Sequence, residues 1–179
     1  ETEFTWNADA NRVVENGIDI AHTSFVHPGF GHREMADKNH IVKIERDEHS
    51  GSSSCVLYPP PMQGNAGLMR FARKDKAETH VHPAFYLSGY CVRLHIQVNS
   101  WMEMIIFDAN TPIDEHTTRS FVVQVRNFFK FGMFDSGSVK RTQKVFREDA
   151  EIVESLSPHY LSDTLESEVS VEQDSFMSS

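Results

Sequence analysis

Four polar side chains that could bind or position a metal ion lie close together near the start of the chain. In the segment ENGIDIAHTSFVHPG, Asn16, Asp19 and His22 are each three residues apart, and His27 follows five residues after His22. Residues three apart stay near one face of a helix. A step of five residues turns about 140° around an ideal helix, at about 100° per residue. The two imidazoles can therefore share a metal ion only if the helix loosens, and Pro28-Gly29 is where we expect it to loosen.

Two histidines do not complete a metal site, so a third ligand must come from elsewhere. Non-haem Fe(II) oxygenases hold iron with two histidines and one carboxylate, which leaves positions open for O2. In the segment VFREDAEIVESL, Glu148 and Asp149 lie among apolar residues. A carboxylate beside the apolar face of a helix needs a partner, because burying an unpaired charge is costly. This segment is therefore a candidate source of the third ligand.

Two helices must position these residues. Residues 11–24 have apolar side chains at helical spacing, with Asn11 as a possible N-cap and Pro28 close after the end. Residues 138–155 have the same periodicity and stop before Pro158. The chain therefore predicts one helix near the start and one long helix near the end.

The residues between the two helices have the alternation and composition of strands. The predicted strands are residues 41–46, 55–58, 84–97, 100–108 and 117–127. Residues 50–54 are rich in Gly and Ser and predict a loop, and residues 66–76 predict a strand or short loop. Turn-like joints at Val98-Asn99 and at residues 110–114 favour antiparallel pairing of sequential strands.

This order predicts an α+β fold in one domain. We expect a helix-grip (START/Bet v 1-like) architecture, in which a curved antiparallel sheet wraps the long C-terminal helix and leaves a ligand cavity. The domain is predicted to span residues 1–160, and residues 161–179 form an acidic, Ser-rich tail that is partly ordered at most. The chain contains 13 Phe, which suits a core and the lining of an apolar pocket.

The composition excludes several classes of protein. A net charge of −9 argues against nucleic-acid binding, which needs a positive field. The longest apolar runs, such as residues 104–107, are too short to span a membrane, and the acidic first residues lack the features of a signal peptide. The two cysteines, Cys55 and Cys91, are isolated and predict free thiols in a reducing compartment, so we expect the cytoplasm. Without a Cys-x-x-Cys or Cys-x-His motif, this chain cannot hold an iron–sulfur cluster by itself.

Three segments resemble one known family. VVENGIDIAHTSFVHPG, residues 13–29, looks like the iron-binding segment of the catalytic α subunit of Rieske-type non-haem iron oxygenases, with the pattern Glu-Asn-x-x-Asp-x-x-His-x4-His. VFREDAEIVESLSP, residues 145–158, resembles the family's later segment that supplies an aspartate ligand. ANTPIDEHTTRSFVVQVRNF, residues 109–128, resembles the strand–turn–strand that precedes it. The similarity covers nearly the whole chain in order and looks closest to the branch with O-demethylases and chlorophyll-breakdown oxygenases.

The resemblance implies a role for each residue of the opening segment. It implies that His22, His27 and Asp149 bind a mononuclear Fe(II). Asp19 matches the family's bridging aspartate, an electron-transfer bridge from the Rieske histidine of a neighbouring subunit to His22. Asn16 matches a residue that lies beside the metal ligands.

The resemblance also implies an activity, a second cofactor and partners. The chain would be the catalytic domain of a terminal oxygenase, which uses O2 and externally supplied electrons to hydroxylate, or to O- or N-dealkylate, an apolar and aromatic substrate. The family's Rieske domain is missing here, so a [2Fe-2S] cluster is expected from a missing domain or another chain. A ferredoxin or a flavin reductase would be the electron donor, and the complete enzyme would be a homotrimer.

Two alternative functions remain at this stage. One is a non-catalytic helix-grip binding module for an apolar ligand, against which the intact three-residue ligand set argues. The other is a cupin-like metal isomerase centred on His80 and His82, which alternate on a predicted strand. No companion Glu and His stand at an obvious spacing from that pair, which argues against it.

Overall fold

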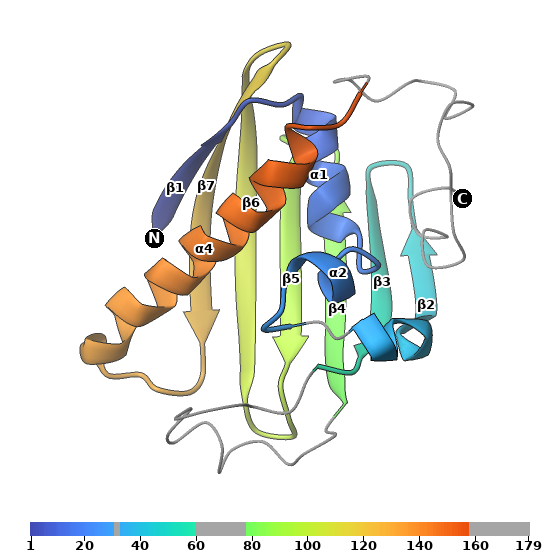
Figure 1. The fold of residues 1–179 in the computed structure, drawn as a ribbon, viewed down its shortest axis with the longest axis vertical. Helices are drawn as coiled ribbons and strands as arrows, with labels where there is room; N and C mark the ends of the chain where they lie inside the picture. Colours follow the sequence, from blue (N-terminus) through green and yellow to red (C-terminus); the bar gives the residue numbers. More distant parts are fainter. Residues whose placement is uncertain (31–32, 60–77, 158–179) are drawn as a thin grey trace.

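The computed structural model describes residues 1–30, 33–59 and 78–157, and a seven-stranded antiparallel sheet forms its centre (Figure 1). The strands are β1 (Thr2–Trp6), β2 (His40–Arg46), β3 (Ser50–Leu57), β4 (Thr79–Tyr86), β5 (Cys91–Gln97), β6 (Glu103–Asp114) and β7 (Thr117–Arg126). They pair in the order β1-β7-β6-β5-β4-β3-β2. From β2 to β7 each strand therefore neighbours the next one in sequence, and β1 is added beside β7.

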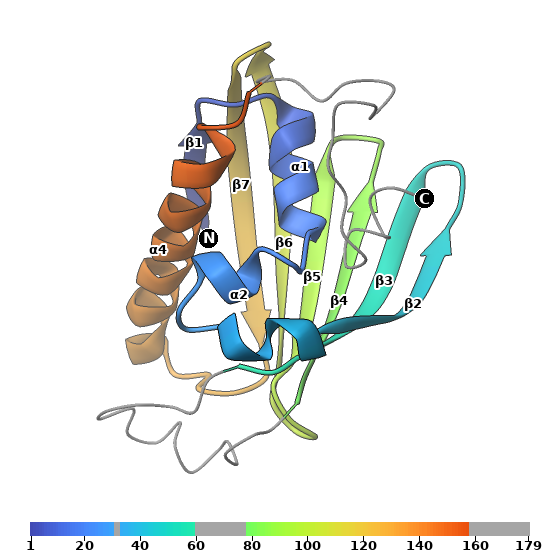
Figure 2. The same ribbon diagram turned by 45° about the vertical axis from the view of Figure 1, so that its right-hand side comes forward.

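The helices gather on one face of this curved sheet (Figures 1 and 2). They are α1 (Ala10–Ile18), α2 (Thr23–Val26) and α4 (Asp135–Val153), accompanied by the 3-10 turns η1 (Arg33–Lys38) and η2 (Gly132–Phe134). α1 packs across β4, β5 and β6, and α4 packs on β1 and α1. Gly17 lets α1 approach the sheet, because a Cβ there would lie 3.2 Å from Cγ1 of the buried Val92.

An apolar cluster fixes α4 to the beginning of the chain. Trp6 of β1 and Val13 of α1 are buried against Ala150 and Val153 of α4. Phe146 packs on this cluster, with its ring centroid 5.3 Å from that of Trp6. Burial of such side chains is the main stabilising contribution available to the fold. The last turns of α4 are therefore held beside β1 and the beginning of α1.

The predicted α+β fold with a curved antiparallel sheet is confirmed. The sheet wraps α1 at its centre, however, and the long C-terminal helix lies beside α1 toward the β1 edge. The ligand cavity stays a prediction. None of the helices in the described part of the chain is both long enough and apolar enough to span a membrane.

Several local predictions were wrong at strand ends. Residues 84–97 are two strands and not one, because the chain turns at Gly89 and Tyr90, whose φ angles are +101° and +50°. Residues 50–54 belong to β3 and not to a loop, since β2 and β4 hydrogen-bond to β3 on both sides and override the weak β-propensity of Gly and Ser.

The strands also differ from the prediction in their number and their end points. β1 was not predicted at all, and it forms by pairing with β7. The turn expected at residues 110–114 lies instead at Glu115-His116, so β6 runs on to Asp114. Residues 66–76 and the tail at 161–179 lie outside the described residues. Both cysteines are free, as predicted, with Cys55 buried and Cys91 half-buried.

Candidate metal centre

The segment that carries the histidines is two short helices and not the single helix predicted for residues 11–24. α1 begins after Asp9, whose carboxylate accepts a hydrogen bond from the backbone N–H of Asn11 at 2.8 Å, so Asp9 and not Asn11 is the N-cap. α1 ends at Ile18, and Asp19 has extended backbone angles. The Asp19 carboxylate accepts hydrogen bonds from the backbone N–H groups of Ala21 (2.6 Å) and His22 (3.3 Å). A short acidic side chain that bonds the N–H groups just ahead of it competes with the helix, which explains the break.

His22 and His27 lie on either side of the single turn of α2. His27 follows that turn with φ −109° and ψ 93°, an extended conformation favoured in a residue that precedes proline. Pro28 therefore causes the loosening that a five-residue spacing requires. The two rings meet, with His22 Nε2 and His27 Nε2 3.3 Å apart.

Asp149 of α4 completes the set from the other end of the chain. Its Oδ1 lies 2.9 Å from His27 Nε2 and 3.4 Å from His22 Nε2. Within the described ranges, these residues are the one group of at least three His, Cys, Asp or Glu whose donor atoms all lie within 4.8 Å of one another. The predicted trio is brought together in space.

The three donor atoms have the spacing that a metal ion needs. Donors about 2.1 Å from a metal and at right angles to one another lie about 3 Å apart. The observed separations of 2.9, 3.3 and 3.4 Å are close to that value. Asp149 is 5% exposed, and its Oδ1 has no hydrogen-bond partner among the residues that the structure describes. An orphaned buried carboxylate oxygen facing two ring nitrogens fits a site for a cation.

Each histidine is held from behind by its own carboxylate. Asp19 Oδ2 lies 3.2 Å from His22 Nδ1, and Glu148 Oε2 lies 2.9 Å from His27 Nδ1. A carboxylate at Nδ1 favours the tautomer with the proton on that nitrogen, so the lone pair of Nε2 faces the centre of the site. The contact predicted between Asp19 and His22 is therefore present.

The surroundings of His27 favour positive charge. Burial by itself would lower the pKa of His27, but the carboxylates of Asp149 and Glu148 raise it above its ordinary value. A proton or a metal ion at His27 is thus stabilised by two adjacent anions. This is the electrostatic setting that a divalent cation needs.

The remaining predicted residues lie elsewhere. Asn16 is half-buried on α1, one turn before Asp19, and no contact described for it reaches a donor atom of the trio. His80 and His82 are on β4, where His82 Nδ1 lies 3.0 Å from Ser54 Oγ and the His82 ring lies beside that of His95, with the ring planes tilted by 39°. Among the residues that the structure describes, no third ligand joins this pair, in contrast to the group at His22, His27 and Asp149.

Sequence reasoning did not assign a role to Glu148. The signal available was its place beside Asp149 in an acidic pair on an otherwise amphipathic helix. Which of the two carboxylates meets the Nε2 atoms of the histidines depends on the rotation of α4, which the sequence alone does not define.

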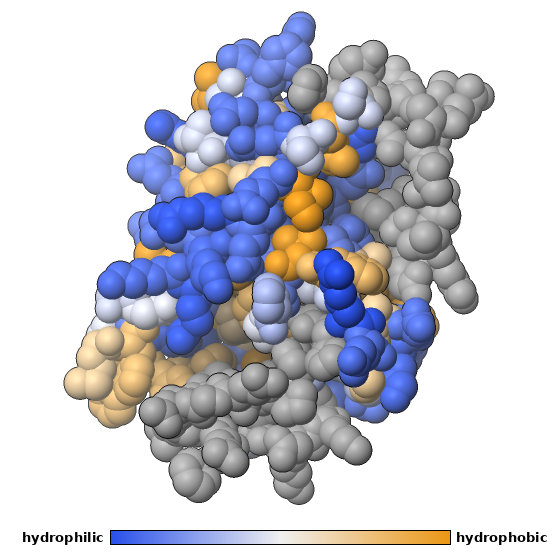
Figure 3. All heavy atoms as spheres, viewed as in Figure 1, coloured by the Kyte–Doolittle hydropathy of each residue, from blue (hydrophilic) through white to orange (hydrophobic). Residues whose placement is uncertain are grey.

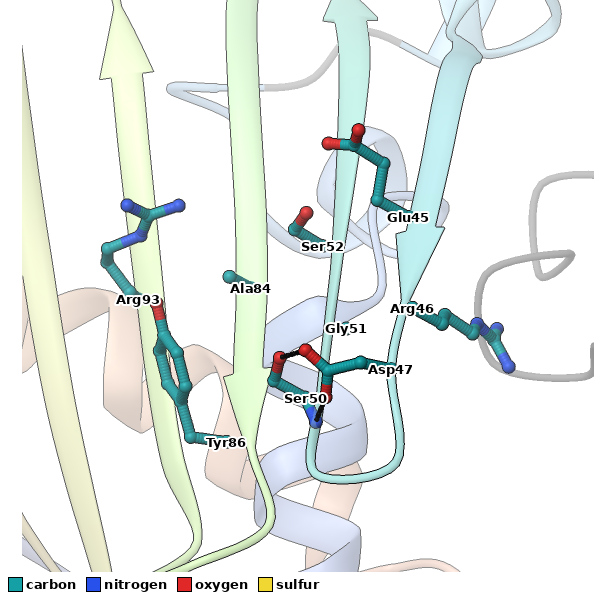
Figure 4. Close-up of a pocket in the computed structure, with 9 residues that line it drawn as sticks. All are labelled: Glu45, Arg46, Asp47, Ser50, Gly51, Ser52, Ala84, Tyr86 and Arg93. Carbon is teal, nitrogen blue, oxygen red and sulfur yellow. Dashed lines mark hydrogen bonds between the residues drawn. The ribbon is translucent and has the colours of Figure 1, made fainter.

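A shallow hollow on the other face of the sheet is separate from this centre. It lies beside the β2–β3 hairpin, with Gly51, Ser52 and Ala84 on its floor and Glu45 and Arg93 on opposite sides (Figure 4). Its lining includes none of the predicted site residues. The sheet stands between it and the helices, so we assign it no part in the metal chemistry.

The chain is similar in sequence to proteins of known activity. The family model described as "Vanillate O-demethylase oxygenase C-terminal domain" matches residues 6–177. The chain is 27% identical over 162 residues to methylxanthine N1-demethylase NdmA of Pseudomonas putida, which covers 87% of this chain and 41% of that protein. It is 24% identical over 158 residues to methylxanthine N3-demethylase NdmB of the same organism, with the same coverage. The chain thus spans about two fifths of the length of these relatives.

Solved structures share the fold. The P. putida NdmA QL mutant with caffeine superposes with a TM-score of 0.70 over 97% of this chain and 45% of that chain, at 22% identity. Dicamba monooxygenase bound to 3,6-dichlorosalicylic acid superposes with a TM-score of 0.70 over 97% of this chain and 54% of that chain, at 13% identity. At these identities the superpositions show a common fold.

Proposed function

Because the chain belongs to the family of vanillate O-demethylase oxygenase C-terminal domains, the catalytic domains of Rieske-type non-haem iron oxygenases, we propose that it is the oxygen-activating domain of a demethylase or related monooxygenase. One observation of the structure carries this proposal. His22, His27 and Asp149 bring three donor atoms together, with His27 and Asp149 buried and His22 half-buried, although they come from distant parts of the chain. Two imidazoles and one carboxylate are the donor set of non-haem Fe(II) oxygenases.

The residues of the site would hold Fe(II) and orient it. Iron bound there supplies the activation of O2, which no protein side chain can perform. The Nε2 atoms of His22 and His27 and Oδ1 of Asp149 would be the ligands, while Asp19 and Glu148 would keep each imidazole in the tautomer that ligation needs. Three protein ligands leave further positions free, as catalysis at a metal requires.

We propose a methyl group on nitrogen or oxygen of an aromatic or heteroaromatic ring as the substrate. The named relatives demethylate methylxanthines at nitrogen, and one of the structures that share the fold is that of a dicamba monooxygenase. One atom of O2 enters a C–H bond of the methyl group, and the other leaves as water after taking up two electrons and two protons. The hydroxymethyl product then loses formaldehyde, and the heteroatom keeps the proton.

We propose that Asp19 links the site to its electron supply. Its carboxylate contacts Nδ1 of His22, and the Asp19 side chain is about one-fifth exposed. Asp19 can therefore contact both the proposed iron ligand His22 and a group that approaches from outside. The electrons would come from a Rieske [2Fe-2S] cluster of a neighbouring subunit in a homotrimer, reduced by a ferredoxin or a flavin reductase. The catalytic domain would comprise residues 1–160 with the tail at 161–179. The free thiols of Cys55 and Cys91 suit a cytoplasmic protein.

The experiment is a count of mononuclear iron. Iron in excess of inorganic sulfide measures the mononuclear site even when a [2Fe-2S] cluster is attached, because the cluster contains equal amounts of both. We expect one excess iron per chain in the wild type and none in His22→Ala, His27→Ala or Asp149→Ala.

A matched control uses a histidine that lies away from the site. His40 is exposed on β2, and His40→Ala should keep the full excess of iron. Full iron content in His22→Ala would rule out the proposed centre. Loss of iron in His80→Ala alone would move the centre to β4.

A further inference from the structure

We propose that Glu148 is a positioning residue of the metal centre, which fixes the ring and the protonated nitrogen of His27 without being a ligand. The inference rests on the proposed function, because it concerns the metal ion that His27 would bind. It assigns different tasks to two adjacent acidic residues, Glu148 and Asp149.

The contacts of the His27 ring separate these tasks. Glu148 Oε2 lies 2.9 Å from Nδ1, and Asp149 Oδ1 lies 2.9 Å from Nε2 on the other side of the ring. A metal ion between the two histidines would contact Nε2 and Asp149, whereas Glu148 is behind the ring. An ionised carboxylate can only accept a hydrogen bond, so Nδ1 donates to Glu148 and Nε2 keeps its lone pair for the metal.

Helix geometry explains why neighbouring carboxylates diverge. Successive residues point about 100° apart around an α-helix. Asp149 points into the core side of α4 and is buried, whereas the Glu148 side chain is 24% exposed at the border of the helix. The outer side of α4 is covered by hydrophilic side chains (Figure 3). Glu148 thus reaches Nδ1 of His27 from the partly exposed edge of α4, and Asp149 reaches Nε2 from the buried side of the helix.

The two carboxylates behind the histidines are anchored differently. Asp19 is fixed by two backbone N–H groups of its own segment. The second oxygen of Glu148, Oε1, instead lies 3.4 Å from Nζ of Lys144, one turn earlier on α4 and 72% exposed. An exposed lysine is a weak anchor, because water and salt screen the pair. The orientation of Glu148 therefore depends mainly on its bond to His27, and the orientation of His27 depends on Glu148.

The test measures metal affinity and not turnover. Protein freed of its mononuclear iron is titrated with Co2+ against a competing chelator, and the visible spectrum of bound Co2+ reports the ligand field. Removing a partner that orients a ligand typically weakens metal binding about 10–100-fold, which is what we expect for Glu148→Ala. Glu148→Gln should recover most of the affinity, because its amide oxygen can still accept from Nδ1–H.

A control and a second variant keep the test decisive. Glu151→Ala, at an exposed position one turn later on the same helix, should bind Co2+ with wild-type affinity and spectrum. If Glu148→Ala fails to fold, Glu148→Asp replaces it, since the shorter side chain keeps the charge but cannot reach His27; the same loss of affinity is expected.

Two results would overturn the proposal. Wild-type affinity in Glu148→Ala would show that His27 is oriented without Glu148. A loss in Glu148→Gln as complete as that in Asp149→Ala would show that Glu148 ligates the metal. Retention of Co2+ in His22→Ala, His27→Ala and Asp149→Ala would instead refute the proposed function itself, so the two failures are distinguishable.

Discussion

Asp108 provides a test of the electrostatics of the interior that does not depend on a metal ion. It lies on the helix-facing side of β6, between Val92 of β5 and Val122 of β7, both of which are buried. Burial raises the pKa of Asp108 from 3.8 to about 7, although polar contacts with Ser120 and Asn110 oppose the shift. Its Oδ1 is buried without a hydrogen-bond partner among the described residues. Ionised Asp108 is therefore a destabilising charge.

The sign of the pH dependence follows from the two pKa values. Below pH 3.8 the carboxyl is protonated in both the folded and the unfolded chain, and its contribution to stability is fully present. Between about pH 4 and pH 7 only the folded chain keeps the proton, so the free energy of unfolding falls as pH rises, by about 1.4 kcal/mol per pH unit. Above about pH 7 both states are ionised and the loss is complete. The total is at most about 4 kcal/mol, for a shift of about three pKa units.

The variant Asp108→Asn cannot titrate, so it isolates this effect from that of the ten histidines. Urea unfolding of wild type and variant at several pH values between 4 and 8 gives the difference in free energy of unfolding. We expect the free energy of unfolding of the variant to increase steadily relative to that of the wild type as pH rises, so that the variant is the more stable protein at pH 8. Asp37→Asn, at an exposed position, controls for the loss of one negative charge. A difference between Asp108→Asn and wild type that stays constant from pH 4 to pH 8 would refute the reasoning.

Three further predictions concern the site and the core. Asp19→Asn should keep its excess iron, because its amide oxygen can still accept the shorter of the two backbone hydrogen bonds, that from the N–H of Ala21, but it should turn over slowly; iron analysis and formaldehyde release check this, and lost iron would make Asp19 structural. Fe2+ added anaerobically to about 100 times its Kd should stabilise the metal-free protein by about 2.7 kcal/mol, a rise in Tm of about 5–11 °C by calorimetry that His27→Ala should abolish. Trp6→Phe removes the 2.7 Å hydrogen bond from Nε1 to Ser120 Oγ and leaves a small cavity, so urea unfolding should show a loss of about 2–3 kcal/mol in the free energy of unfolding. In a Ser120→Ala background the loss should be smaller, because only the cavity remains; an equal loss in both backgrounds would show that the hydrogen bond contributes nothing.

The arrangement of His22 and His27 could be predicted from the sequence, because it depends on residues that are close together in the chain. His22 and His27 are separated by one helical turn, and Pro28 imposes the extended conformation that brings their rings together. Both features are visible in the sequence. The break at Asp19 was not predicted, because hydrophobic periodicity continues across it while a side-chain-to-backbone hydrogen bond ends the helix.

The third donor, which comes from the other end of the chain, could be predicted from the residues only as a choice between the carboxylates of Glu148 and Asp149. Periodicity places residues 148 and 149 on a helix, but the rotation of that helix is set by packing against Trp6 and Val13, far away in sequence. The resemblance selected Asp149, and the structure places its Oδ1 2.9 Å from His27 Nε2. The sheet shows the same contrast between local and remote information. β6 and β7 could be predicted from the local alternation of their residues, whereas β1 and the start of β3 form only by pairing with neighbouring strands.

The packing of α4 and the hydrogen bonds of the histidine segment explain how three donor atoms that repel one another stay close together. Asp149 Oδ1 and two imidazole nitrogens within 3.4 Å of one another repel unless a proton or a metal ion lies between them. α4 is nevertheless held by a core cluster that includes Ala150 and Val153, directly beside Asp149, and the histidine segment is held by the backbone bonds of Asp19. The stability of the core thus opposes the repulsion within the site. A metal ion bound between these atoms would relieve that repulsion without reorganising the elements, which is what preorganisation for a cation requires.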